Sequence, residues 1–247
     1  MPRFFVNQSD VYSDAINITG EDVNHIKRVL RLKCGDNIVL NAGNGIDYTV
    51  EIEKFEQDYI RTLIISSNKN GTEPPIEITL FQGLPKSDKM DFIIQKSVEL
   101  GVKKVVPVIT TRTVAKIDNP KDAEKKVTRW QRISLEAAKQ CNRGIVPQIG
   151  FPLTLEQALS STKGEDLSII LYEKEIENSL RKYIDKNQHI KRIAMFIGPE
   201  GGFEETEIAK AVSYGVNPVT LGPRILRTET AGITVLSILM YQLGDVG

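Results

Sequence analysis

The rhythm of secondary structure changes abruptly near residue 72, and this change constrains the fold more than any other feature. Before it, short segments rich in β-branched and aromatic residues alternate with turns, which is typical of strands. After it, predicted strands and helices alternate to the end of the chain. A polar stretch containing Gly and Pro, residues 68–75, separates the two parts. We therefore predict two domains, residues 1–72 and 73–247.

The first part is predicted to be a small β domain with one helical segment. Strands are expected at residues 3–6, 36–56 and 59–66, with Gly43–Gly45 forming a hairpin turn inside the second range. A helix is expected to begin at Thr19, followed by two acidic residues and the apolar stripe of Val23, Ile26 and Val29–Leu30.

The second part is predicted to be an α/β domain with a mostly parallel sheet covered by helices. Strands are expected at 76–83, 102–110, 166–172, 190–198 and 218–222. Helices are expected at 87–101, 123–142, 203–215 and 229–243, the first capped by Ser87 and closed by Gly101. The last helix is apolar on nearly every side, so we expect it to be buried in the core or in a subunit contact.

Composition excludes several classes of protein. No run approaches the roughly 20 apolar residues of a membrane span, and no secretory signal is recognisable, so we expect a cytoplasmic protein that is not bound to membranes. Two cysteines and two distant histidines favour neither a disulfide framework nor a metal site, and we expect no metal. The 32 basic and 32 acidic side chains cancel. Local basic clusters at 23–34 and 110–143 are compatible with phosphate binding or with solvated helix faces.

Two glycine-rich loops follow consecutive predicted strands. They are Ile197-Gly-Pro-Glu-Gly-Gly-Phe203 and Leu221-Gly-Pro-Arg-Ile-Leu-Arg-Thr-Glu-Thr-Ala231. In open parallel sheets, ligands bind beyond the carboxyl ends of strands, and glycine lets a ligand approach bare backbone groups. Ordinary turns between strand and helix are the alternative. A Rossmann G-x-G-x-x-G, a P-loop and a G-x-S-x-G elbow are all missing, so the loops favour a ligand site that is not a phosphate cradle.

These two loops resemble the paired signature of the RsmE family of 16S ribosomal RNA uracil-N3 methyltransferases, within the trefoil-knotted SPOUT superfamily. The resemblance extends over essentially the whole chain. The further matching segments are MPRFFV, HIKRVLRLKCGD, GLPKSDKMDFIIQKSVELGV, VVPVITTRTV and RWQRISLEAAKQCNR with VPQI after it. The resemblance implies a PUA-like RNA-binding β-barrel at 1–72 and a SPOUT domain at 73–247 whose C-terminal segment forms a deep trefoil knot, an exception to the usual rule against knots.

By the same resemblance, the knot loops bind S-adenosylmethionine and the enzyme is a homodimer. The expected cofactor-binding residues are Leu171, Tyr172, Glu173, Gly198, Pro199, Glu200, Gly201, Gly202, Leu221, Gly222, Ile225, Leu226 and Arg227. The expected RNA-binding residues are Arg3, Lys27, Arg28, Arg31, Lys86, Lys89, Arg112 and Arg143. The implied substrate is 16S rRNA in the small ribosomal subunit.

The implied reaction is attack of uracil N3 on the methyl group of the cofactor. Because N3 carries a proton that must leave, the site needs a base or a cation that stabilises the uracil anion. Arg227 is the candidate cation, and Glu200 or Glu229 the candidate proton acceptor, although Glu229 can also serve the start of the last helix. A SPOUT ribose 2′-O-methyltransferase and a non-catalytic RNA-binding or ribosome-assembly protein are the alternatives.

Overall fold

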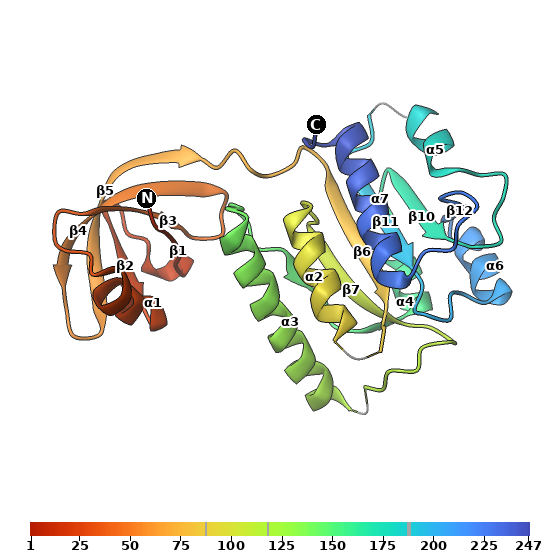
Figure 1. Cartoon of the computed structure of the whole chain (residues 1–247), viewed down its shortest axis with the longest axis horizontal. Coiled ribbons are helices and arrows are strands. Elements are labelled where there is room, and N and C mark those ends of the chain that lie inside the picture. The colour runs from red at the N-terminus through yellow and green to blue at the C-terminus, as the bar shows by residue number, and fades with distance from the viewer. Residues whose placement is uncertain (87, 118, 187–188) are drawn as a thin grey trace. The chain divides into compact units, whose positions relative to one another are not determined.

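The chain folds into two units (Figure 1). The computed structural model describes residues 1–86, 88–117, 119–186 and 189–247. One unit contains Met1–Glu73 together with Ala138–Val146. The other contains Pro74–Ala137 and Pro147–Gly247. Residues 138–146, which we expected in the second domain, therefore contact the first unit, and helix α3 (Pro120–Gln140) contributes its last residues to it.

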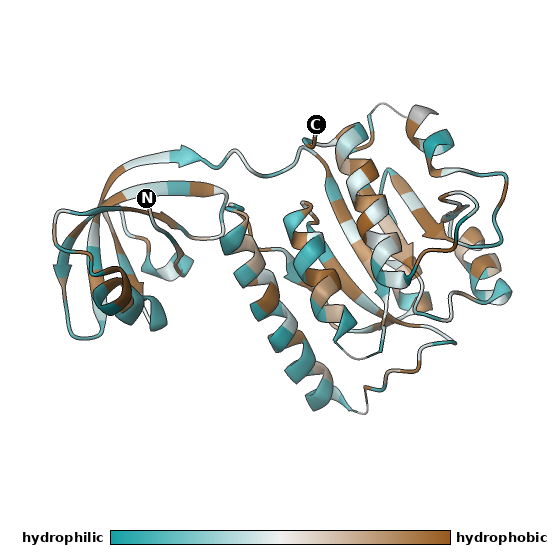
Figure 2. Ribbon diagram, viewed as in Figure 1, coloured by the Kyte–Doolittle hydropathy of each residue, from teal (hydrophilic) through white to brown (hydrophobic). Residues whose placement is uncertain are grey.

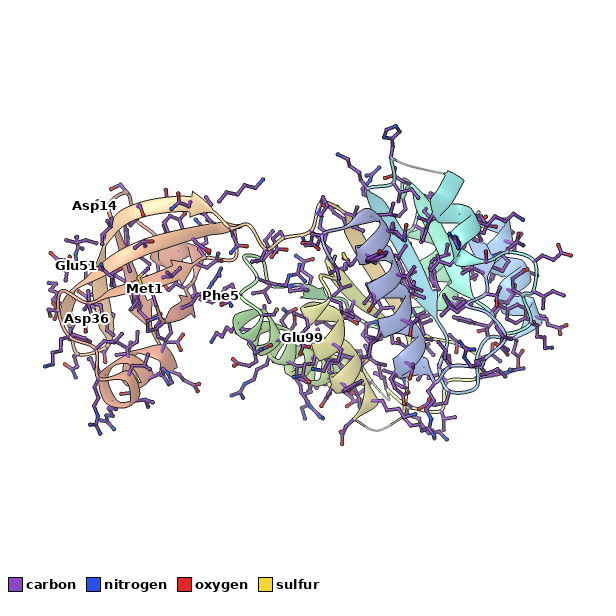
Figure 3. All side chains as sticks on the ribbon, turned by 45° about the horizontal axis from the view of Figure 1, so that its top comes forward. Met1, Phe5, Asp14, Asp36, Glu51 and Glu99 are labelled. Atoms are coloured by element: carbon purple, nitrogen blue, oxygen red, sulfur yellow. The ribbon has the colours of Figure 1, made fainter. Side chains whose placement is uncertain are left out.

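The first unit is a curled five-stranded sheet in the order β1-β3-β4-β5-β2, within the described residues. Its strands are β1 (Arg3–Phe5), β2 (Ala15–Thr19), β3 (Asn37–Asn41), β4 (Ile46–Phe55) and β5 (Tyr59–Lys69). All neighbours are antiparallel except β1 and β3. Alternate residues such as Ile38, Leu40, Val50 and Ile52 are fully buried. Acidic side chains such as Asp14, Asp36 and Glu51 project outward, as Figure 3 shows.

A short helical segment joins β2 to β3 and differs from the prediction. We expected one helix beginning at Thr19, but Thr19 ends β2, a strand that we did not predict. Gly20, at φ +73°, turns the chain into α1 (Glu21–Asn24), which continues as a π-helix over His25–Leu30. Arg31 ends the segment in the left-handed region at φ 54°. The predicted turn at Gly43–Gly45 is confirmed, since β3 and β4 flank it and both glycines have positive φ.

The second unit is built on a parallel sheet, as predicted. Among the described residues its order is β12-β10-β11-β6-β7-β8, with β9 also paired to β7. The strands are β6 (Glu77–Gly83), β7 (Lys104–Ile109), β8 (Gln148–Ile149), β9 (Leu153–Thr154), β10 (Leu167–Leu171), β11 (Arg192–Ile197) and β12 (Asn217–Val219). The helices besides α3 are α2 (Lys89–Glu99), α4 (Leu155–Ser160), α5 (Leu180–Lys186), α6 (Glu205–Ser213) and α7 (Thr228–Leu243).

Helices cover both faces of this sheet (Figure 1). On one face, α4 and α6 pack on strand residues in a cluster that includes the stacked rings of Phe81 and Phe196, 4.5 Å apart. On the other face, α2 and α7 pack against each other, and α7 lies over β11. Figure 2 shows the hydrophobic residues concentrated in the strands and on the inner sides of the helices. Burial of these side chains supplies the main stabilisation of the unit.

The predicted alternation of strands and helices is confirmed for every element that we named after residue 76. Gly101 follows the end of α2 at φ +87°, as expected of a residue that closes a helix. Ser87, the expected cap of α2, lies outside the described residues. The short elements α4, α5, β8 and β9 were not predicted. Their few residues show too little periodicity to be distinguished from loop.

Candidate functional site

A cavity of about 870 Å³ opens at the carboxyl edge of the second sheet, where β10, β11 and β12 end. Three segments form most of its lining: residues 171–173 with 175–176 after β10, residues 197–202 after β11 and residues 219–228 after β12. Lys89 and Ala231 complete the lining. This is the edge at which parallel sheets bind ligands. Every residue that we expected to bind the cofactor lines this one cavity, including Glu200 and Arg227. The two glycine-rich loops therefore share a single cavity.

The loop after β11 is braced by neighbouring side chains and by its own backbone. Gly202 donates its N–H to the carbonyl oxygen of Pro199 at 2.9 Å and has φ +68°. A Cβ atom on Gly202 would also lie 3.2 Å from the carboxylate oxygens of Glu173. Arg112 Nη1 donates to the carbonyl oxygen of Gly201 at 2.8 Å. Only glycine satisfies both the backbone conformation and the close approach at position 202.

Lys89, at the start of α2, connects two acidic residues at the cavity. Its ammonium group lies 3.0 Å from Glu200 Oε1 and 3.5 Å from Glu229 Oε2. The same Glu200 oxygen accepts the backbone N–H of Lys86 at 3.1 Å. Burial disfavours ionisation of Glu200, but hydrogen bonds from its own backbone, Lys89 and Lys86 outweigh burial and lower its pKa. The hydrogen bond to Glu200 in turn raises the pKa of Lys89. Both groups are therefore held in their charged forms.

The loop after β12 has few such restraints. Gly222 donates its N–H to Thr220 Oγ1 at 3.1 Å, which shapes the start of the loop. Ile225 is 84% exposed although it lines the cavity. Among the described residues, no hydrogen bond or ion pair holds the guanidinium groups of Arg224 and Arg227, and both side chains are exposed. These two cations are available to an anionic or electron-rich ligand.

The segment after β10 was only partly predicted. Glu175 and Ile176 line the cavity in addition to the expected Leu171, Tyr172 and Glu173. Backbone N–H groups of Asn178 and Glu177 donate to Glu175, which lowers its pKa and shapes the turn. Ile176 is 86% exposed. This segment contains neither a glycine nor a recognisable motif. Nothing in the sequence therefore signalled that Glu175 and Ile176 would line the cavity.

The candidate acids occupy different positions. Glu200 lines the cavity, whereas Glu229 lies in the first turn of α7 and is not part of the lining. A carboxylate at this position of a helix is favoured by the helix dipole. Glu229 Oε2 is buried and, among the described atoms, has only the 3.5 Å approach of Lys89 as a counterpart.

The eight basic residues expected to bind RNA divide into two groups. Arg3 and Arg143 form ion pairs within the first unit: Arg3 is partly buried and pairs with Asp47 at 2.5 Å, and Arg143 is buried and pairs with Glu73 at 2.6 Å. Arg143 is only 4% exposed. A guanidinium engaged in this way reaches a phosphate only by breaking its ion pair, so RNA binding by either arginine stays a prediction that requires its pair to open.

The other basic residues are more accessible. Lys27 donates to the carbonyl oxygen of Glu56 at 2.7 Å and lies over the ring of Phe55. Arg28 and Arg31 are exposed on the π-helix and just after it. Lys86 has an exposed side chain, while Lys89 and Arg112 brace the loop after β11, as described above.

Within the part of the chain that the structure describes, no helix is both long and apolar enough to cross a membrane. Over the same residues, His, Cys, Asp and Glu side chains nowhere gather in the groups of three or more that could hold a metal ion.

The sheet, its cavity and the preceding β unit define an RNA methyltransferase that carries a PUA domain. The family model of the RNA methyltransferase domain matches residues 72–240, and that of the RNA methyltransferase PUA domain matches residues 18–60. The first model alone covers more than half of the chain.

Similar proteins identify the family within this class of RNA methyltransferases. Ribosomal RNA small subunit methyltransferase E of Bacillus subtilis is 33% identical over 98% of this chain and 97% of its own length. A ribosomal RNA small subunit methyltransferase E from Neisseria gonorrhoeae, solved with S-adenosyl methionine, superposes with a TM-score of 0.87 at 32% identity and full coverage of both chains. A Legionella pneumophila methyltransferase solved with the same cofactor gives 0.86 at 34% identity, covering 99% of this chain and 98% of its own. The chain belongs to the ribosomal RNA small subunit methyltransferase E family.

Proposed function

We propose that this protein transfers a methyl group from S-adenosylmethionine to N3 of a uridine in 16S rRNA of the small ribosomal subunit. The observation that carries the proposal is the single cavity lined by both glycine-rich loops in a member of this family. The N-terminal PUA unit supplies RNA binding and the α/β unit supplies methyl transfer, with the functional division near residue 72.

The cavity fits the cofactor in size and in chemistry. Its volume of about 870 Å³ lies within the range of small-molecule sites. Gly198 and Gly202 carry no side chain of their own, so a ligand can approach their backbone closely, while Leu171, Ile225 and Leu226 offer apolar surface to a purine ring. We propose that these residues hold S-adenosylmethionine, which supplies an electrophilic methyl group when bound.

The charges around the cavity favour Arg227 as the group that assists the uracil. Loss of the N3 proton leaves negative charge on the ring, and a nearby cation lowers the free energy of that anion. Arg227 lines the cavity and, among the described residues, has no carboxylate partner that would neutralise it. Arg224 lies in the same loop and can contact an adjacent phosphate.

The two candidate acids are better suited to bracing than to proton transfer. Glu200 has a lowered pKa and already accepts two hydrogen bonds, so it is a weak base at neutral pH. Glu229 lies outside the cavity lining. We therefore propose that Arg227 stabilises the N3 anion while the proton passes to solvent, and that Glu200 and Glu229 fix Lys89.

The exposed pair Arg28 and Arg31 is proposed to bind rRNA phosphates. Each phosphate contact contributes a slope of about −0.7 to −0.9 to the dependence of log affinity on log salt. Charge reversal of both arginines should reduce the slope by about two. Lys163 and Lys191 provide a matched control, because they precede β10 and β11 at the sheet edge opposite the cavity and are exposed. An unchanged slope in the Arg28 and Arg31 variant would argue against this surface.

We further propose that the protein is a cytoplasmic homodimer and that its C-terminal segment forms the trefoil knot of the superfamily. Two observations support these points. After β12 at the sheet edge, the chain returns over the central strand β11 as α7. The side of α7 away from the sheet carries partly exposed Ile233, Ile238 and Tyr241, which a second subunit can cover. Light scattering of the purified protein measures the oligomeric state.

Incubation with labelled cofactor and small subunits that lack the modification tests the proposed function. We expect label in 3-methyluridine after digestion of the rRNA. Label in a 2′-O-methyl nucleoside would replace the proposal with ribose methylation. No label, together with no cofactor binding in calorimetry, would indicate a non-catalytic RNA-binding protein.

A further inference from the structure

A buried polar cluster lies beneath the cavity, at the point where β6, the loop after β11 and the start of α7 meet. Gln82 is the penultimate residue of β6, and its side chain is fully buried next to the buried Leu80 and Phe81. Thr228 is the first residue of α7 and is also buried. Burying an amide and a hydroxyl is unfavourable unless both are hydrogen-bonded, so their partners determine what the cluster does.

The hydrogen bonds form a directed chain that ends on the first glycine-rich loop. Gln82 Nε2 donates to Thr228 Oγ1 at 2.9 Å, and Thr228 Oγ1 donates to the carbonyl oxygen of Gly198 at 2.6 Å. The second amide hydrogen of Gln82 goes to the carbonyl oxygen of Gly83 at 3.0 Å. One side chain of β6 is thereby connected to both cavity loops.

The orientation of the Gln82 amide is determined by these partners. Exchange of Nε2 and Oε1 would place an acceptor oxygen against the Gly83 carbonyl and remove the donor to Thr228. In the observed orientation Oε1 is buried and has no hydrogen-bond partner among the described atoms. Leaving a buried acceptor unpaired costs free energy, and the two hydrogen bonds that Nε2 donates offset part of that cost.

Backbone packing at the same point is equally tight. A Cβ atom on Gly83 would lie 2.5 Å from Pro199 N and 2.8 Å from Gly198 C. The end of β6 is therefore in direct contact with the first peptide of the loop after β11. Small displacements of Thr228 or Gly198 are transmitted to the cavity walls, because both residues line the cavity.

We propose that Gln82 and Thr228 are positioning residues for methyl transfer. Gln82 fixes the Thr228 hydroxyl so that its proton points to Gly198, and this bond sets the spacing between the loop that precedes Thr228 and the loop that begins at Gly198. Neither residue is assigned contact with the reacting atoms. The inference deepens the proposed function and rests on it, since the spacing matters for aligning the uracil with the methyl donor.

Substitution of Gln82 by glutamate tests this role through pH. A protonated carboxyl group retains one hydrogen that can be donated to Thr228, whereas the ionised form retains none and faces the Gly83 carbonyl. Burial raises the pKa of such a carboxyl group, so ionisation occurs as pH rises through the raised value. We expect Gln82→Glu to add a decline of kcat with rising pH that the wild type lacks, and Gln82→Leu to lower kcat at every pH.

Substitutions of Thr228 provide a second, independent test. Thr228→Ser keeps the hydroxyl group and should retain near-wild-type turnover. Thr228→Val removes it, and we expect kcat to fall about 10- to 100-fold because the loops shift relative to each other. Thr62→Val is the matched control: Thr62 is a fully buried threonine of β5 whose hydroxyl donates to the Ile16 carbonyl oxygen at 2.8 Å. It should lower stability similarly and leave kcat and its pH profile unchanged.

The results of these experiments distinguish the positioning role of Gln82 and Thr228 from the proposed methylation of uridine. A wild-type pH profile for Gln82→Glu with wild-type kcat for Thr228→Val would overturn the positioning role. If Gln82→Glu does not fold, the Thr228→Ser and Thr228→Val pair decides alone. If wild-type protein binds S-adenosylmethionine but methylates no uridine, the proposed function fails, and the inferred role in methyl transfer fails with it. If the wild type methylates uridine and the Gln82 and Thr228 variants do so equally well, the positioning role is wrong and the proposed function stands.

Discussion

The two glycine-rich loops of the cavity both contain Gly-Pro after a strand, but they differ in how many contacts hold them in place. The loop after β11 is contacted by Arg112 at Gly201, by Lys89 at Glu200 and by Thr228 at Gly198. The loop after β12 keeps its central residues exposed, with Ile225 84% accessible, and its two arginines have no partner within the described part of the chain.

This difference indicates a division of labour in binding. A loop that is already fixed loses little conformational entropy when a ligand arrives, which favours affinity. A loop with fewer such contacts loses more conformational entropy when a ligand immobilises it, at about 1–2 kcal/mol per backbone residue that becomes fixed. We infer that the braced loop supplies a preformed wall and that the loop after β12 offers the ligand cations that are unpaired among the described residues.

The largest expected effect is that of replacing Arg227, and it tests whether the loop after β12 takes part in methyl transfer. Arg227→Ala should lower kcat about 10²- to 10³-fold, the usual loss when a group that stabilises developing negative charge is removed. Its effect on cofactor affinity should be much smaller, and Arg227→Lys should restore part of the rate because the charge is retained. Steady-state kinetics and calorimetry measure the two quantities. Near-normal turnover in Arg227→Ala would remove this residue from the mechanism.

Sequence alone was informative where local pattern determines structure. The alternation of strands and helices after residue 76 follows from hydrophobic period and helix-ending glycines, and the structure confirms it. The shared cavity of the two loops followed from the rule that parallel strands end at one edge.

What sequence could not show depends on contacts between distant residues. Arg3 and Arg143 were expected to contact RNA, yet each pairs with an acid far away in the chain, Asp47 and Glu73. Lys89 and Arg112 are similar cases, since their partners lie about 90 to 140 residues away. Gln82 did carry a signal in the sequence. An amide side chain beside apolar residues of a predicted buried strand needs a buried hydrogen-bond partner.

The next prediction asks whether the braced loop depends on the packing below it. Gly83→Ala places a Cβ atom 2.5 Å from Pro199 N, which is backbone and cannot rotate away. We expect unfolding free energy to fall by about 1–3 kcal/mol, as overpacking usually costs, and cofactor affinity to weaken with it. Gly71→Ala is the control, because nothing lies within 4 Å of its added Cβ atom and its φ is not positive. Equal behaviour of the two variants in denaturant titrations would contradict the tight contact.

The ion pair between Lys89 and Glu200 predicts a pH dependence of the same loop. The pKa of Glu200 is lowered in the folded protein, so its stabilising contribution is present above the ordinary glutamate pKa. It is lost as pH falls through the lowered value. Glu200→Gln should therefore lower Tm at neutral pH by about 2–4 °C or less, the equivalent of a partly exposed pair worth about 1 kcal/mol or less. The difference from wild type should disappear in acid, and a difference that persists unchanged there would show that Glu200 acts other than through its charge.

The smallest expected effect is that of replacing Arg112, and it distinguishes two roles of this residue: holding the loop after β11 and binding RNA. Its guanidinium holds the Gly201 carbonyl at 2.8 Å but is 45% exposed, so solvent competes for the bond. Arg112→Ala should weaken cofactor binding by less than about fivefold, or about 1 kcal/mol, and leave the salt dependence of RNA binding unchanged. The reverse result, with unaltered cofactor affinity and a salt slope reduced by about one, would assign Arg112 to a phosphate contact. In that case the loop after β11 would lose one of its restraints, and the contrast between the two loops would be correspondingly weaker.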